Sequence, residues 1–123
     1  MRIIIDTHIY LWALSSPKEI PEPLLAEVKT LSNTIYVSAV SIAEIAIKAS
    51  TGKLDVTFDP VSLIEKSGFQ KLDFRCEDAA LLKDLPFHHR DPFDRMLIAQ
   101  SIAHNWPILT VDDKFKAYDC RLV

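Results

Sequence analysis

The stretch Arg2-Ile3-Ile4-Ile5-Asp6 decides the fold class, because three β-branched residues in a row lead straight into a carboxylate. An uninterrupted apolar run of this length is typical of a parallel strand that is buried on both faces. Open α/β sheets bind their ligands beyond the carboxyl ends of such strands. We therefore expect Asp6 at the ligand-binding edge of a parallel sheet.

The rest of the chain alternates strand-like and helix-like patterns, as α/β folds do. Further strands are predicted at residues 35–37, 69–74, 107–111 and 120–123. Helices are predicted at residues 7–14, 22–31, from Ser38 or Ser41 to about Gly52, 59–68, 77–83 and 91–102. We expect a central parallel β-sheet flanked by helices, in a single domain that spans residues 1–123.

The composition fits one domain, because 123 residues with 49% hydrophobic side chains can bury a core without further support. Cys76 and Cys120 are far apart and lack a C-x-x-C context, so we expect buried, reduced thiols rather than a disulfide or a zinc site. No apolar run approaches the ~20 residues that span a bilayer, which predicts a cytoplasmic protein with no membrane contact. A net charge of −3 disfavours a surface that attracts nucleic acid everywhere.

Three further carboxylates interrupt apolar patterns, and each also has a purely structural interpretation. Glu44 shares a polar helical stripe with Ser41 and Lys48, which also fits an exposed ion pair on a solvated face. Asp94 lies in the first turn of a helix that Asp91-Pro92 opens, where capping and the helix dipole explain both acids. Asp112 and Asp113 follow a strand, and we favour the turn for Asp113 and the site for Asp112. Asp91 competes with Asp94 in the same way, and helix phase favours Asp94 at the inner position.

Together with Asp6, these acids predict a divalent-metal site. Oxygen ligands from strand ends and helix starts suit Mg²⁺, with Mn²⁺ as an alternative, whereas zinc prefers His and Cys. Without a cation, clustered carboxylates repel one another and their pKa values rise. Two bound Mg²⁺ ions would move the formal charge of the chain from −3 to +1, so the cleft would attract phosphate.

At this point the motifs resemble a known family. They are Asp6-Thr7-His8 after the first strand, Glu44 ahead of Gly52-Lys53-Leu54, HRDPFDR at residues 89–95, and Thr110-Val111-Asp112. In this order the chain resembles a PIN-domain ribonuclease of the VapC toxin type. The resemblance runs from residue 2 to about residue 115, and DPFDRMLIAQ at residues 91–100 is its most specific part.

The resemblance implies Mg²⁺-dependent hydrolysis of RNA phosphodiester bonds by an endoribonuclease. Carried over residue by residue, it gives Asp6, Glu44, Asp94 and Asp112 as catalytic and metal-binding residues. Thr7, Thr110, Asp91 and Arg95 follow as supporting residues. It further implies a cognate antitoxin that occludes the cleft, and a homodimer. We expect residues 22–31 and the apolar helix from Val40 to contribute to the dimer or antitoxin surface.

The other conspicuous side chains receive simpler interpretations. The basic residues near the cleft either bind phosphate or lie on ordinary solvated surface; they are Lys48, Lys53, His88, His89, Arg90 and Arg95. We interpret His88 and His89 as loop histidines near RNA or solvent, because adjacent residues do not share a face. Trp12, Phe93 and Met96 lie in apolar helical patterns and are assigned to the core.

Three rival functions fit the sequence less well. An aspartate-nucleophile phosphatase needs a second Asp two residues after Asp6, where this chain has His8. A P-loop or dinucleotide-binding enzyme is disfavoured because Gly52 and Gly68 are the only glycines and neither belongs to a phosphate-binding loop. A noncatalytic PIN-fold module that binds protein or RNA remains the main alternative.

Overall fold

A computed structural model describes all 123 residues and contains one four-stranded sheet, in which every paired neighbour is parallel. The strand order is β3-β2-β1-β4, with the bounds β1 Arg2–Ile5, β2 Thr34–Ser38, β3 Gln70–Leu72 and β4 Ile108–Leu109. Strands β2 and β3 are added in turn on one side of β1, and β4 is added on the other side. The order of the sheet therefore reverses between β1 and β4, and open α/β sheets bind ligands at such points.

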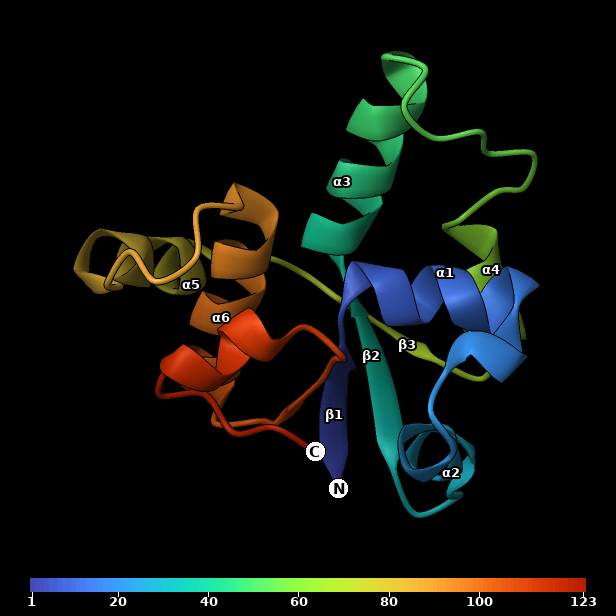
Figure 1. Ribbon diagram of the computed structural model, residues 1–123, viewed down its shortest axis with the longest axis horizontal. Helices are drawn as coiled ribbons and strands as arrows, with labels where there is room; N and C mark the ends of the chain where they lie inside the picture. The colour runs from blue at the N-terminus through green and yellow to red at the C-terminus, as the bar shows by residue number, and fades with distance from the viewer.

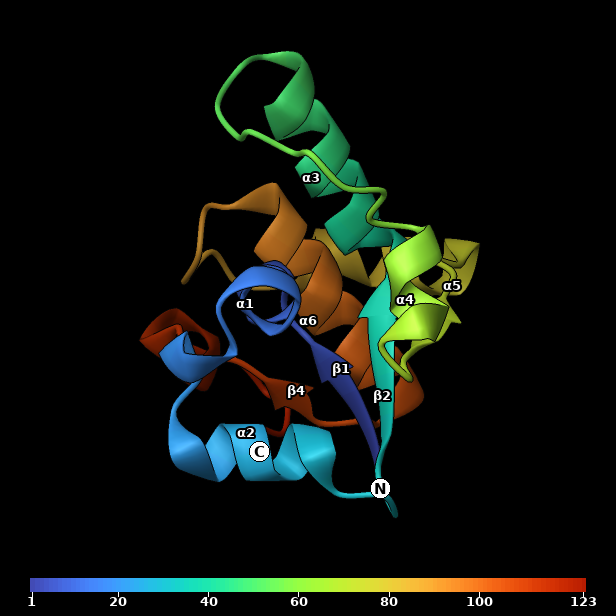
Figure 2. The ribbon, with the colours of Figure 1, turned by 90° about the vertical axis from the view of Figure 1, so that its right-hand side faces the viewer.

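Six α-helices surround this sheet (Figure 1). Their bounds are α1 Thr7–Ser15, α2 Glu22–Lys29, α3 Ala39–Ser50, α4 Ser62–Lys66, α5 Cys76–Ala80 and α6 Pro92–His104. Helices α5 and α6 cover one face, α1, α2 and α4 lie on the other, and α3 projects beyond the sheet (Figures 1 and 2). The fold is the α/β arrangement that the sequence predicts.

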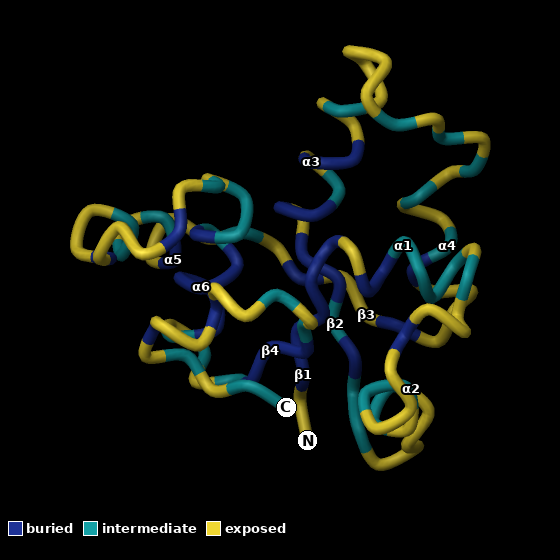
Figure 3. The backbone as a smooth tube through the Cα atoms, in the orientation of Figure 1, coloured by how far each residue is buried: buried dark blue, intermediate teal, exposed yellow.

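The side chains of β1 alternate between two apolar clusters, one on each face of the sheet. Ile3 and Ile5 belong to the cluster under α1, whereas Ile4 belongs to the cluster under α6. All three are fully buried, since successive side chains of a strand point to opposite faces and both faces are covered. Figure 3 shows this buried centre, while the tip of α3 and the segment after it are exposed or intermediate.

Helix boundaries near the site follow from capping. The Ser38 hydroxyl accepts a hydrogen bond from the Val40 amide, so α3 starts directly after β2. Asp91 caps α6 and Pro92 occupies its first position, as predicted. At the other end of α6, Asn105 adopts a left-handed conformation with φ of 57°, which stops the helix after His104 rather than after residue 102.

Several predicted elements are shorter than the sequence patterns indicated. The strand expected at residues 69–74 is reduced to β3, and the one at residues 120–123 is a single bridge between Leu122 and Ile108. In the segment 59–68, the Asp59 carboxylate binds the amides of Val61 and Ser62 in a turn, so α4 begins three residues after Asp59. The helix predicted at residues 77–83 is α5 followed by a 3₁₀ turn at Leu81–Asp84.

Cys76 and Cys120 are both free thiols. Cys120 is partly buried, but the prediction of a buried Cys76 was wrong, because Cys76 opens α5 on the surface and is exposed. None of the helices combines the length and the apolar character needed to cross a lipid bilayer.

Candidate active site

An acidic cavity lies where the carboxyl ends of β1 and β4 meet the middle of α3 and the start of α6. Its volume is about 270 Å³, and Val111 is the one hydrophobic residue in its lining. The other lining residues are Asp6, Thr7, His8, Glu44, Lys48, His89, Asp91, Asp94 and Asp112. The structure thus brings together the four predicted acids, which come from segments up to about a hundred residues apart.

Asp6 is fixed on both oxygens. Its Oδ1 accepts a hydrogen bond of 2.8 Å from the Ile9 amide and caps α1, while the Thr110 hydroxyl donates to its Oδ2. Burial raises the pKa of Asp6, and the hydrogen bonds from Thr110 and Ile9 oppose that rise. Thr110 therefore orients the carboxylate, whereas the Thr7 hydroxyl donates to Ser41 at 2.9 Å instead.

Glu44 lies inside the cavity wall and is only 6% exposed, so the interpretation as a solvated face is wrong. Its Oε2 is 2.6 Å from the Lys48 ammonium, which is half-exposed. That hydrogen bond raises the pKa of Lys48. The second oxygen, Oε1, is buried and has no hydrogen-bond partner, an arrangement that is costly for a carboxylate unless something else binds it.

At the start of α6, Asp91 caps the helix and Asp94 lines the cavity. Asp91 accepts hydrogen bonds from the amides of Phe93 and Asp94 at 2.8 and 3.3 Å through Oδ1, which confirms it as the cap. Asp94, one turn further on, points into the cavity. Burial and the neighbouring Asp91 raise the pKa of Asp94 to about 7, although His89 opposes this. The site therefore carries negative charge that its own residues do not neutralise.

Asp112 rather than Asp113 faces the cavity. Asp112 Oδ1 accepts a 2.9 Å hydrogen bond from the Lys114 amide, and its Oδ2 lies 3.3 Å from His89 Nε2. Asp113 points to solvent and pairs with Lys116 at 2.9 Å. The assignment of Asp113 to the turn and Asp112 to the site agrees with this geometry.

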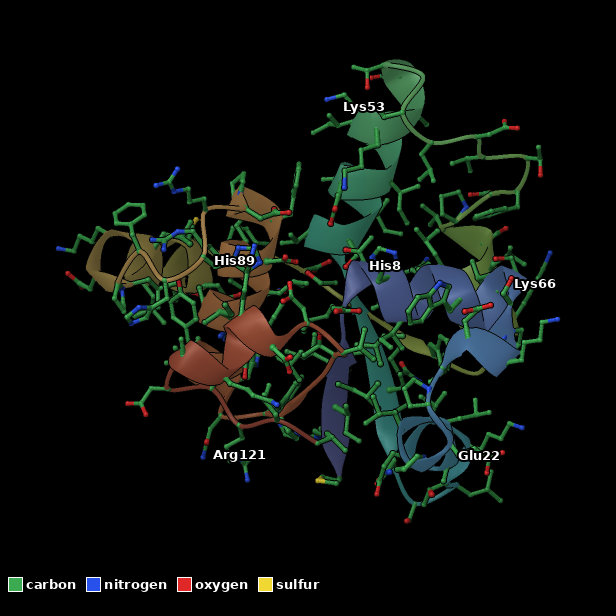
Figure 4. The ribbon with its side chains drawn as sticks, viewed as in Figure 1. His8, Glu22, Lys53, Lys66, His89 and Arg121 are labelled. Carbon is green, nitrogen blue, oxygen red and sulfur yellow. The ribbon has the colours of Figure 1, made fainter.

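The sequence placed His89 near the cleft as a loop histidine, but it did not predict that His89 is buried among the acids. Its Nε2 lies 2.8 Å from Asp94 Oδ2, and the ligand atoms of His89, Asp94 and Asp112 all lie within 4.8 Å of one another. Figure 4 labels His89 beside α6 and His8 at the start of α1, on opposite sides of the site. His88, by contrast, is exposed as predicted and lies edge-on against Tyr118.

The PIN-domain family model matches residues 3–119. The chain belongs to the PIN-domain family. A sequence comparison with curated proteins gives no match. The family assignment therefore rests on the domain model, in agreement with the resemblance of the motifs.

Solved structures of similar fold cover nearly the whole PIN domain. VapBC2 from Rickettsia felis bound to a promoter DNA fragment has a TM-score of 0.70 and 21% identity over 99% of this chain and 96% of that one. DNA-bound VapBC from Salmonella typhimurium has a TM-score of 0.66 and 16% identity over 99% and 96%. VapBC-5 from Mycobacterium tuberculosis, of a family of toxin–antitoxin systems, has a TM-score of 0.59 and 18% identity over 96% and 90%. These likenesses show the shared fold.

Arg95 does not line the cavity of this PIN domain, and neither alternative given for it, a phosphate contact in the cleft or ordinary solvated surface, agrees with its position. The side chain is buried, and its guanidinium donates hydrogen bonds to the carbonyl oxygens of Leu82, Leu85 and Pro86 and to the Tyr118 hydroxyl. It therefore holds the segment before α6 in place. Trp12, Phe93 and Met96 pack against the two apolar clusters, as predicted.

The donor set fits a small divalent cation. Carboxylates and retained waters are the ligands that Mg²⁺ and Mn²⁺ prefer. A cation in the cavity would give Glu44 Oε1 the partner it lacks and would favour ionised Asp94, whose pKa is raised without one. A metal site would explain both features of this PIN domain.

Proposed function

We propose that this protein is a Mg²⁺-dependent endoribonuclease and the VapC-type toxin of a type II toxin–antitoxin pair. The observation that carries the proposal is the convergence of Asp6, Glu44, Asp94 and Asp112 on one cavity, with a buried Glu44 oxygen that has no partner. Membership of the PIN-domain family supports a nuclease. The fold that the chain shares with VapBC structures supports the toxin assignment.

Asp6, Glu44, Asp94 and Asp112 would hold Mg²⁺, with Mn²⁺ as a substitute. When bound, the cation supplies charge stabilisation to the phosphodiester and makes water a better nucleophile. Thr110 keeps the Asp6 carboxylate in one orientation, so less ordering is needed when the cation arrives. The raised pKa of Asp94 means that binding of the cation is coupled to loss of a proton near neutral pH.

A second, basic hollow continues from the acidic cavity and supports a polyanionic substrate. The two hollows share Thr7, His8, Glu44 and Lys48, and the second one, of about 180 Å³, adds Lys53 from the turn after α3. Gly52 has a φ of +75°, and the amide of Lys53 folds back onto the carbonyl of Lys48. Lys48 and Lys53 thus flank the route out of the acids, where they would contact phosphates of an RNA strand.

Partners form part of the same proposal. The Mycobacterium tuberculosis relative belongs to a family of toxin–antitoxin systems, and the Rickettsia and Salmonella complexes are bound to DNA. We therefore include a cognate antitoxin, a homodimer and a cytoplasmic location. Leu31, which follows α2, is fully exposed, and Ile47 on α3 is 51% exposed. These apolar side chains support the prediction that both segments contribute to an interface.

The test is cleavage of a mixed cellular RNA pool by antitoxin-free protein, with Mg²⁺ and with EDTA. The variants are Asp94→Asn and, as a matched control, Asp113→Asn, which changes an exposed acid outside the cavity. We expect discrete cleavage by wild type and Asp113→Asn with Mg²⁺, and none by Asp94→Asn or with EDTA. Cleavage that persists in Asp94→Asn would contradict the assignment of Asp94 to the active site. No cleavage by folded wild type would favour the noncatalytic binding module.

A further inference from the structure

His89 lies in the loop before α6, but hydrogen bonds and ring packing fix both its backbone and its side chain. Its backbone amide donates a 2.8 Å hydrogen bond to the Tyr118 hydroxyl, which in turn donates to the Pro86 carbonyl at 2.8 Å. Arg95 binds the same carbonyl and the same hydroxyl. The imidazole packs edge-on against Phe115, with ring centroids 6.1 Å apart. The side chain is therefore only 7% exposed, and its Nε2 faces the acidic cavity.

The hydrogen bonds of the two ring nitrogens have opposite polarity. Nδ1 accepts a hydrogen bond from the Asp91 amide at 3.3 Å, and a nitrogen that accepts carries no proton. A neutral imidazole then has its proton on Nε2. Nε2 faces two acceptors, Asp94 Oδ2 at 2.8 Å and Asp112 Oδ2 at 3.3 Å. Every contact of the ring is satisfied by this one tautomer.

We propose that His89 is a positioning residue that donates from Nε2 to the carboxylates of Asp94 and Asp112, and that it does not itself bind the cation. A histidine that ligates a metal through one nitrogen usually donates from the other to a carboxylate or carbonyl. Here Nδ1 faces the Asp91 amide N–H. If Nε2 bound the cation, the ring proton would move to Nδ1, and two N–H donors would then face each other. The inference rests on the proposed function for its consequence, but its geometry stands without it.

The consequence concerns which oxygens stay free. Both oxygens of Asp6 and both oxygens of Asp112 have one partner each within the protein, so they would bind a cation only through their remaining lone pairs, and Oδ2 of Asp94 accepts from His89. Oδ1 of Asp94 has no hydrogen bond, like the buried Oε1 of Glu44. His89 therefore fixes the Asp94 rotamer so that one oxygen remains open to a cation. Loss of the donor would allow Asp94 to rotate and would weaken cation binding.

The first test records nitrogen-15 spectra of the imidazole rings at mildly alkaline pH, without metal and with Mg²⁺. We expect the proton of His89 on Nε2 in both states. In the Mn²⁺-loaded protein, electron spin-echo spectra should contain no coupling from a directly bound nitrogen. A proton on Nδ1, or a nitrogen coupling to Mn²⁺ that disappears in His89→Gln, would overturn the proposal because His89 would then be a ligand.

The second test measures Mg²⁺ affinity by calorimetry in folded variants. His89→Gln keeps an N–H donor, whereas His89→Leu removes it, and His88→Leu is the exposed neighbouring control. We expect His89→Leu to lose about 10–100-fold in affinity, and His89→Gln and His88→Leu to retain most of it. Equal losses in the Gln and Leu variants would overturn the positioning role. A wild type that neither binds Mg²⁺ nor cleaves RNA would refute the proposed function, while the nitrogen spectra would still decide the role of His89.

Discussion

In metal-free protein, Asp94→Asn should increase the free energy of unfolding, even though it should abolish cleavage. Burial and the nearby acids raise the pKa of Asp94 from 3.8 to about 7, so the folded protein holds this proton more tightly than the unfolded chain does. The stabilisation from Asp94 is therefore fully present below about pH 4 and is lost as the pH rises through about 7. Asparagine has no such charge, and its contribution does not change over this range.

The magnitude follows from the same pKa. A change from 3.8 to about 7 corresponds to about 4 kcal/mol, at about 1.36 kcal/mol for each pKa unit. The Asp94 side chain is 18% exposed, so solvent weakens its electrostatic interactions with the neighbouring acids. After this discount we expect a gain of about 2 kcal/mol for Asp94→Asn at about pH 8, and almost none at about pH 4.

Urea unfolding with a chelator present, followed by circular dichroism across this pH range, measures the effect. Asp113→Asn is the control and should lie within about 0.5 kcal/mol of wild type throughout, because its side chain is on the surface. Added Mg²⁺ should stabilise wild type more than Asp94→Asn, since only wild type has the full ligand set. If Asp94→Asn is less stable than metal-free wild type at about pH 8, ionised Asp94 does not destabilise the metal-free fold, and the reasoning is refuted.

Two further predictions concern the residues around the acids. Thr110→Val removes the hydroxyl that holds Asp6 and should lower Mg²⁺ affinity by about 10–100-fold without loss of the fold. Calorimetry measures this affinity, and Thr57→Val at an exposed position is the control. Unchanged affinity in Thr110→Val would contradict the orienting role. Lys53→Gln should raise KM for RNA and reduce the salt dependence of binding by about one phosphate contact, while kcat stays the same. Lys66→Gln on α4 is its control, and equal effects of the two would contradict a substrate route past α3.

Local chemistry made part of the fold and site predictable. The apolar run 2–5 and its terminal Asp6 specify a buried parallel strand and its functional edge, because both faces of that strand are covered. Asp91-Pro92 identifies the start of α6 because an N-cap and a first-turn proline need no tertiary partner. The same strand-end position indicated Asp112 and Asp113 as the pair from which the last acid comes, and the cavity lining includes Asp112.

The remaining features depend on long-range packing, which one sequence does not encode in a readable pattern. Glu44 has the spacing of an exposed ion pair, and only the approach of β1 and α6 to α3 buries it. His89 belongs to the HRDPFDR stretch, but its burial results from Tyr118 and Phe115, which lie more than twenty residues away. Arg95 looks like a phosphate-binding residue until the carbonyl groups that it binds are located in space.

The contact between Asp6 and Thr110 joins residues 104 positions apart, and it has a consequence for the nascent chain. At roughly 5–20 residues per second, a ribosome needs about 5–20 s to make that interval. Until β4 emerges and pairs with β1, Asp6 lacks its hydroxyl partner and Asp112 is not yet at the site. Under the proposed function, a half-made copy of the protein would therefore be harmless to the message and the ribosome that are producing it.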